Sequence, residues 1–165
     1  MRSRSALFFV LAEIGFATLI HAQNATTFLN PGIKLGYTFG DNGGFTYGAE
    51  ISYVWMIRPE HSSGAGASIG PVLDIDFLPR MSRIHLGIET AYAVGGLVAV
   101  GVCGGPTILF KDGDDYWGYS VIPFIGALMY PYFNYTSVGE LRSTEVGGYL
   151  KYHLHTGAGT FNLVR

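Results

Sequence analysis

Residues 44–56, GFTYGAEISYVWM, alternate between two kinds of side chain at every step. Six apolar, mostly aromatic side chains fall on one side: Phe45, Tyr47, Ala49, Ile51, Tyr53 and Trp55. The side chains between them are mostly small or polar: Thr46, Gly48, Glu50, Ser52 and Val54. Successive side chains of a β-strand face opposite sides of a sheet, so this segment predicts a strand with one aromatic face. A soluble sheet buries such a face in a core, whereas a membrane barrel turns it toward lipid.

The same alternation recurs along the chain between segments rich in turn-forming residues. Further strands are predicted over 31–39, 68–77, 83–94, 97–111, 116–135, 144–154 and 160–164. The connections at 40–44 (GDNGG) and 112–115 (DGDD) contain Gly, Asp and Asn, which tolerate left-handed backbone conformations. The segment 116–135 is one long strand or two joined pieces. We therefore expect an all-β fold of about eight strands.

Two uncharged segments raise a helical alternative. Residues 93–110 carry no charge over 18 residues and residues 116–139 carry none over 24, both long enough for a membrane helix. The first contains five glycines and a proline among β-branched residues, and the second contains two prolines and a cluster of Tyr and Phe. Gly and β-branched residues weaken helices, and interior Pro interrupts them. The barrel is the favoured interpretation.

The polar face of the predicted strands indicates which side meets lipid. It combines small residues with both signs of charge, and its ionisable members are Lys34, Glu50, Asp74, Asp76, His85, Glu89, Glu145, Lys151 and His153. Only 13 % of the chain is charged, about half the roughly 25 % usual in soluble domains. A water-facing sheet would carry more Lys and Glu. These residues are instead predicted to fill and pair within the narrow lumen of a small barrel.

The apolar face supports the same orientation. Aromatic residues stand at both ends of the first hairpin, with aliphatic residues between them, which is typical of the aromatic girdles of a lipid-facing surface. The proposed girdle consists of Tyr37, Phe39, Phe45, Tyr47, Tyr53 and Trp55.

The N-terminus has the features of a signal peptide. Arg2 and Arg4 precede an apolar run over 6–20, and Ala22 offers a small residue at a plausible cleavage point, although Glu13 interrupts the run. We expect a leader over 1–22 and a barrel domain over 23–165. The alternative is an uncleaved membrane-anchor helix.

With its leader, alternating strands, Gly-rich polar face and aromatic strand ends, the chain resembles the small outer-membrane β-barrel superfamily of Gram-negative bacteria. The resemblance covers the leader and nearly all of 31–163. It implies an antiparallel up-and-down transmembrane barrel located in the outer membrane, with lipid and the barrel assembly machinery as partners. Two features depart from the family pattern. The chain ends FNLVR rather than on an aromatic residue, and its longest connection, 58–67, follows the second strand.

Three functions remain open from the sequence. The first is a structural or porin-like outer-membrane barrel with a largely filled polar lumen. The second is a lipid hydrolase or acyltransferase, for which the available pieces are Ser120, Glu140, Glu145, His153 and His155. The third is a secreted, lipocalin-like ligand-binding barrel with its aromatics turned inward.

Several other functions are not expected. The net charge of −2 gives no basic footprint for nucleic acid, and the glycines lack the strand-to-helix setting of a phosphate loop. The single cysteine, Cys103, excludes an intramolecular disulfide or a cysteine-built metal site. No cofactor, metal site or catalytic residue is predicted, and the oligomeric state is left open.

Overall fold

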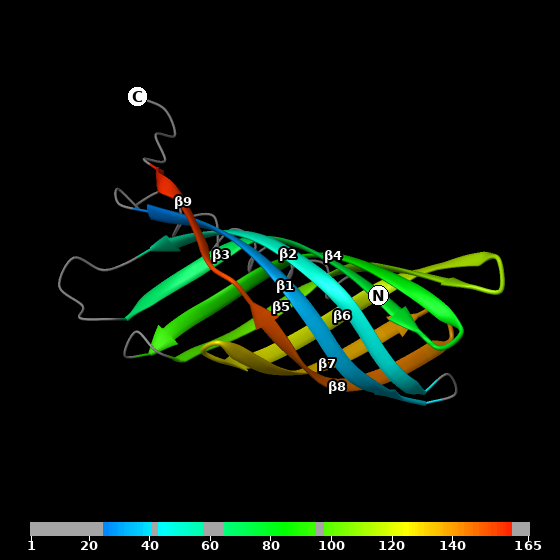
Figure 1. Cartoon of the computed structure of the whole chain (residues 1–165). Helices are drawn as coiled ribbons and strands as arrows, with labels where there is room; N and C mark the ends of the chain where they lie inside the picture. Colours follow the sequence, from blue (N-terminus) through cyan, green and yellow to red (C-terminus); the bar gives the residue numbers. More distant parts are fainter. Residues whose placement is uncertain (1–24, 41–42, 58–64, 95–97, 160–165) are drawn as a thin grey trace, which may run out of the picture.

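The computed structural model describes residues 25–40, 43–57, 65–94 and 98–159, and all regular structure in these ranges is β-strand (Figure 1). The strands are β1 (Ala25–Phe39), β2 (Gly44–Ile57), β3 (Gly66–Leu78), β4 (Met81–Val94), β5 (Val98–Lys111), β6 (Asp114–Gly126), β7 (Met129–Val138), β8 (Leu141–Lys151) and β9 (Leu154–Gly159). The predicted leader over 1–22 and the short strand over 160–164 lie outside the described residues.

The strands form a closed antiparallel barrel. Each strand from β1 to β8 pairs with the next along the chain, and β8 also pairs with β1, which closes the ring. This confirms the predicted all-β, up-and-down barrel of eight strands. The described residues of both candidate helical segments form strands and turns, and 116–135 divides into β6 and β7. In the described part of the chain, no helix is long and apolar enough to cross a membrane.

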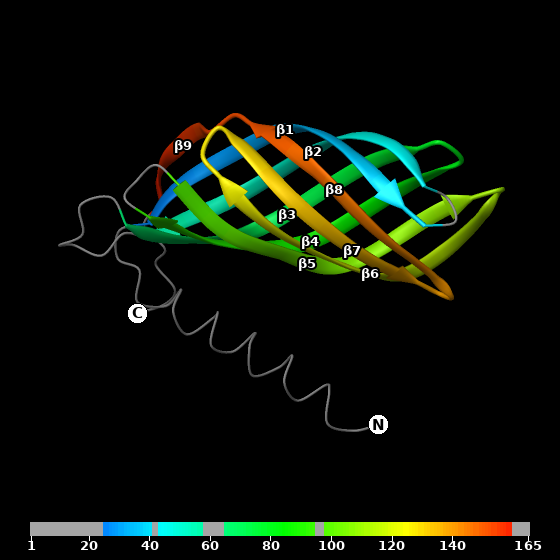
Figure 2. The ribbon, with the colours of Figure 1, turned by 90° about the horizontal axis from the view of Figure 1, so that it is seen from below.

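β9 continues β8 after a break at residues 152–153. β8 pairs with the second half of β1, from Gly32↔Lys151 to Phe39↔Thr144, whereas β9 pairs with the first half of β1. The backbone N–H of Tyr152 donates to the carbonyl of Pro31 across the break, at 2.9 Å. The seam of the barrel therefore lies between β1 and one interrupted strand, formed by β8 and β9 (Figure 2).

The two ends of the barrel differ. At one end, here called the turn end, the connections β1–β2, β3–β4, β5–β6 and β7–β8 are two to four residues long. The β5–β6 turn has φ of 54° at Asp112 and 92° at Gly113, the conformation that an Asp-Gly hairpin turn requires. The other end, the terminal end, holds the start of β1 and the end of β9. The longest connection, between β2 and β3, lies at the terminal end. The four connections that follow β1, β3, β5 and β7 are all short.

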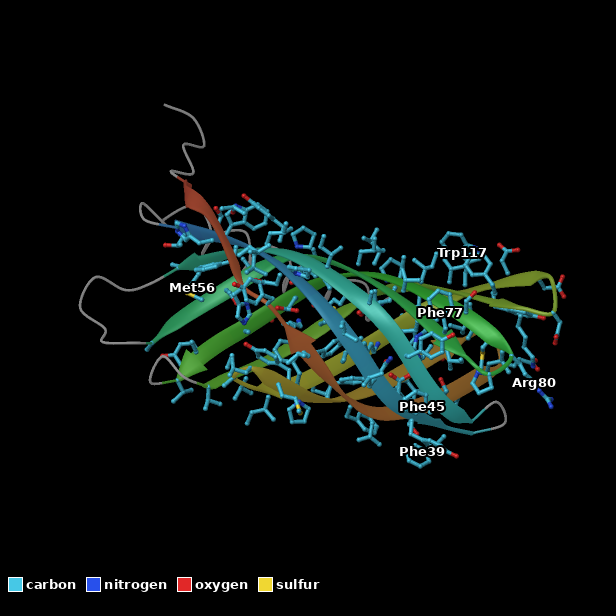
Figure 3. All side chains as sticks on the ribbon, in the orientation of Figure 1. Phe39, Phe45, Met56, Phe77, Arg80 and Trp117 are labelled. Carbon is cyan, nitrogen blue, oxygen red and sulfur yellow. The ribbon has the colours of Figure 1, made fainter. Side chains whose placement is uncertain are left out.

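Side-chain polarity is inverted relative to a soluble barrel. Charged and polar side chains are buried inside, while large apolar side chains such as Ile33, Leu86 and Trp117 are more than half exposed on the outside. Figure 3 shows Phe39, Phe45 and Trp117 projecting outward, with Met56 toward the opposite end. Because successive side chains of a strand point to opposite faces, the alternation in the sequence gives the sheet one polar and one apolar face. In this barrel the polar face lies inside.

Glycines on the inner face make room for aromatic rings. A Cβ atom on Gly36 would lie 2.6 Å from the Tyr132 hydroxyl, and one on Gly147 would lie 2.6 Å from the Tyr132 Cζ. Tyr132 is 3 % exposed and packs against Tyr149, with ring centroids 4.5 Å apart. The interior is thus filled by large rings opposite positions that have no side chain.

Candidate functional site: the barrel interior

The turn-end half of the interior contains a group of contacting side chains here called the ionic plug: Lys34, Asp76, Arg83, Tyr132 and Glu145. Arg83 donates to Asp76 Oδ2 from Nε at 2.9 Å and from Nη2 at 2.6 Å, and its Nη2 lies 2.7 Å from Glu145 Oε2. Lys34 Nζ also donates to Asp76 Oδ2, at 2.9 Å. The Tyr132 hydroxyl donates to the second oxygen of Glu145. These contacts span the lumen from β1, β3 and β4 to β7 and β8.

A chain of buried hydroxyl groups borders the ionic plug. Arg83 Nη1 contacts the Thr136 hydroxyl at 3.3 Å, and Thr136, Ser120 and Thr107 follow one another at 2.8 Å. Thr107 then meets His85 Nδ1 at 3.0 Å. Each of these groups is satisfied by a neighbour, as buried polar groups generally are. The hydroxyl chain therefore fills the lumen beside the plug.

A second ionic group, centred on Lys151, lies closer to the terminal end. Its ammonium is 2.5 Å from Glu50 Oε1 and 2.6 Å from Glu89 Oε2. The same ammonium lies 5.2 Å from the centroid of Phe124 and 4.9 Å from that of Tyr149, within cation–π range. Lys151 is thus held by two carboxylates and surrounded by aromatic rings.

Carboxylates outnumber cations in the described interior. The buried carboxylates are Glu50, Asp74, Asp76, Glu89 and Glu145, and the buried cations are Lys34, Arg83 and Lys151. Asp74 is 1 % exposed, and neither of its carboxylate oxygens has a hydrogen-bond partner within the residues that the structure describes. Asp74 is therefore a buried carboxyl group that no hydrogen bond to the described residues holds in place.

Replacing Asp74 with Asn is expected to leave the free energy of unfolding unchanged or to raise it by about 1 kcal/mol. The substitution removes an unpaired buried charge, which costs stability, while keeping the size of the side chain. Urea titration in lipid vesicles measures the change, and Asp114→Asn at the exposed β5–β6 turn is the control. A loss of stability well beyond that of the control would show that Asp74 is paired in the native protein.

A cavity of about 240 Å³, here called the cup, occupies the terminal-end half of the interior. Its walls are mainly apolar and include Phe28, Val54, Ala91, Ala99 and Phe124, and it extends to the ends of the strands at Met56, Gly66, Ala93 and Val98. Glu89, Lys151 and His153 supply its ionisable groups. The interior thus has two parts, a filled ionic plug and an open, mostly apolar cup.

Strand pairing in the barrel wall is incomplete beside Lys151. β7 begins at Met129, which pairs with Leu150, and among the described strands β9 pairs only with β1. A hollow on the outer wall, formed by residues of β1, β8 and the β6–β7 connection including Leu128, also reaches Lys151. Lys151 is therefore a residue common to the cup, which its buried side chain faces, and the outer hollow.

The structure places the nine predicted lumen residues in two settings. Eight of them, all except His153, are buried in the interior with 6 % exposure or less. His153 lies in the break between β8 and β9 at the edge of the cup, where its ring nitrogens contact Tyr130 Oη at 3.0 Å and Asn30 Oδ1 at 2.8 Å. Four predicted girdle residues, Tyr37, Phe39, Phe45 and Tyr47, are about half exposed on the outer face. The other two, Tyr53 and Trp55, are partly exposed, with their rings 5.3 Å apart.

Arg83, which joins Asp76 to Glu145 in the ionic plug, was not among the residues predicted from the sequence. Arg83 stands two residues before His85, so the alternation of β4 places it on the same inward face. The spacing of two residues from His85 could therefore have identified Arg83 as an inward-facing residue. Tyr149 shares the inward face of β8 with Glu145 and Lys151, and Tyr132 on β7 is buried against it.

The residues considered as the active site of a lipid-modifying enzyme do not form one cluster. Ser120 bonds to Thr107 and Thr136 in the hydroxyl chain, and Glu145 belongs to the ionic plug. His155 packs edge-on against Phe28 at a centroid distance of 5.5 Å. Glu140 is exposed in the β7–β8 turn. Among the described residues the structure gives no nucleophile–base pair from this set, and no group of three or more potential metal ligands.

Comparison with known proteins finds little at the level of sequence. No family model matches the chain, and no curated protein matches it. Among solved structures, the chain is similar to the crystal structure of Neisserial surface protein A (NspA), at 9 % identity and a TM-score of 0.40, over 76 % of this chain and 95 % of that one. The class of the molecule therefore follows from its own strand pairing: it is a closed, antiparallel, eight-strand β-barrel.

Proposed function

We propose that the chain is an outer-membrane β-barrel protein with a structural role, whose lumen is closed by its own side chains. The observation that carries the proposal is the inverted polarity, with paired charges inside and half-exposed Ile, Leu and aromatic side chains outside. A contiguous apolar surface of this kind is unfavourable in water and favourable in lipid. The aromatic residues toward both strand ends suit the two membrane interfaces.

The paired side chains that cross the turn-end half of the lumen support the structural role over the porin-like one. Eight-stranded barrels have interiors just wide enough to be filled by side chains, and aqueous channels need more strands. Here Arg83 reaches from β4 to Glu145 on β8 across the turn-end half. The lipocalin-like alternative requires the aromatic residues to face inward, whereas Tyr37, Phe45 and Tyr47 are more than half exposed on the outer face.

The location follows as part of the same proposal. An outer-membrane barrel is exported through a cleaved signal peptide and inserted by the barrel assembly machinery, and the leader-like residues 1–22 fit that route. Fractionation of Gram-negative cells expressing the chain tests it. An outer-membrane band whose gel mobility changes on boiling is expected, whereas a soluble periplasmic band would overturn the proposal.

In planar lipid bilayers, the purified protein is expected to produce no conductance steps above the baseline of the bare membrane. Moving an ion past Arg83 and its carboxylates would require breaking buried ion pairs, which is costly. A sixteen-stranded porin reconstituted in the same way is the positive control. Regular, protein-dependent steps would show that the plug opens and would favour the porin-like role.

A further inference from the structure

The cup is not explained by a structural role. A purely structural barrel does not require an open apolar cavity, and protein cores generally contain few voids larger than a water molecule. The cup has a volume of about 240 Å³, and it borders the Lys151 group on the inside. Small-molecule sites usually combine apolar walls with a few polar groups in this way.

The size of the cup limits its ligand. An apolar cavity of about 150 Å³ accommodates one benzene molecule, so the cup has room for about ten non-hydrogen atoms. The aromatic rings of Phe28, Phe124 and Tyr130 line it. A single ring or a short alkyl chain with one polar group fits this space, whereas a complete phospholipid does not.

The charged side chains around the cup determine which polar group a ligand can carry. Glu89 lines the cup and Glu50 stands behind it, and both share the single ammonium of Lys151. Among the described residues, Lys151 is the only Lys or Arg that lines the cup, and the side chains of Glu50 and Glu89 already contact its ammonium. An anionic ligand would therefore find no free Lys or Arg in the cup. A cationic ligand would be attracted to Glu89 and to the aromatic walls.

We propose that the cup binds a small apolar molecule carrying one primary amino group, with the ammonium at Glu89 and the apolar part against the cup walls. The inference goes beyond the proposed function. Lys151 lines both the cup and the outer hollow, so the proposed site lies on the inner side of the strand segment that borders this hollow.

Three ligands that share a phenyl group test the proposal: 2-phenylethylamine, 2-phenylethanol and phenylacetate. They are titrated into isotope-labelled protein in non-ionic detergent micelles, and binding is followed through backbone amide NMR signals. The amine is expected to bind about tenfold or more tightly than the other two, because a charged hydrogen bond is the difference between them. The shifts are expected at cup residues and absent at the turn end.

Two variants check where the amine binds. Glu89→Gln is expected to weaken amine binding by about tenfold, since it removes the charged partner while Glu50 still holds Lys151. Ala91→Leu is expected to abolish binding by filling the cup. Glu140→Gln, at the opposite end, is the matched control and is expected to bind like the parent. Heat-modifiable gel mobility establishes that each variant is folded.

Other outcomes overturn the proposal. Equal binding of all three ligands, tighter binding of phenylacetate, or amine binding unchanged in folded Glu89→Gln would each reject an amine site at Glu89. Absence of binding by the folded parent protein would reject a ligand site for molecules of this class. None of these results would alter the fractionation or conductance results, so failure here is distinguishable from failure of the proposed function.

Discussion

Replacing Arg83 with Met is expected to lower the free energy of unfolding by about 3–5 kcal/mol. The substitution keeps an unbranched side chain of similar length but removes the guanidinium that binds Asp76 and Glu145. Two carboxylates would then share Lys34 as their remaining nearby cation, 2.9 Å from Asp76 and 3.8 Å from Glu145. Urea-induced unfolding in lipid vesicles, followed by tryptophan fluorescence, gives the change.

Arg142→Met is the matched control for this prediction. Arg142 is exposed near the β7–β8 turn, so its loss is expected to change the free energy of unfolding by about 0.5 kcal/mol or less. Adding Glu145→Gln to the Arg83 variant is expected to recover part of the loss, because it removes one of the stranded charges. Equal stability of the two arginine variants would show that water, rather than Arg83, satisfies the carboxylates.

Gly147→Ala is expected to destabilise the barrel by about 2–3 kcal/mol through overpacking. The added methyl group would lie 2.6 Å from the Tyr132 Cζ and even closer to the Tyr132 hydroxyl and the Leu35 carbonyl. Tyr132 cannot move freely, because its hydroxyl is bonded to Glu145 and its ring packs on Tyr149. The midpoint of urea unfolding is the measurement.

The adjacent glycine provides the control. A Cβ atom on Gly148 would meet nothing closer than 3.8 Å, the distance to Met129 Cγ, and this residue belongs to the opposite face of β8. Gly148→Ala is therefore expected to leave stability unchanged or to raise it by about 0.5 kcal/mol, because alanine restricts the unfolded chain. If both variants lost the same stability, strand propensity rather than the space around Tyr132 would be the cause.

The architecture was predictable because it depends on a pattern of period two. The alternation in β2 separates Glu50 from Ile51 and Tyr53, and the same rule along the other strands indicates which residues face inward. Turn chemistry indicated where individual strands end, most clearly at Asp112 and Gly113. These are local properties, so a single sequence contains them.

The partners within the lumen were not predictable from the same pattern. Lys34 on β1 bonds to Asp76 on β3, and Arg83 on β4 bonds to Glu145 on β8, so the pairs join strands that are not neighbours. Such pairs depend on the closure of the barrel and its register, which alternation does not specify. The β6–β7 turn at Ala127 and Leu128 lacks the usual turn residues, which explains why the pattern left one strand or two open.

The seam between β1 and the interrupted strand β8–β9 has a consequence for how the barrel forms. All other neighbouring strands are hairpins, in which nearby residues pair first, whereas the seam joins groups as distant as Thr27 and Gly157, 130 positions apart. Closing so large a loop carries the greatest entropic cost and is expected to be the slowest step of folding. Until the final strand reaches β1, the chain is an open sheet with two unpaired edges, the form most exposed to aggregation.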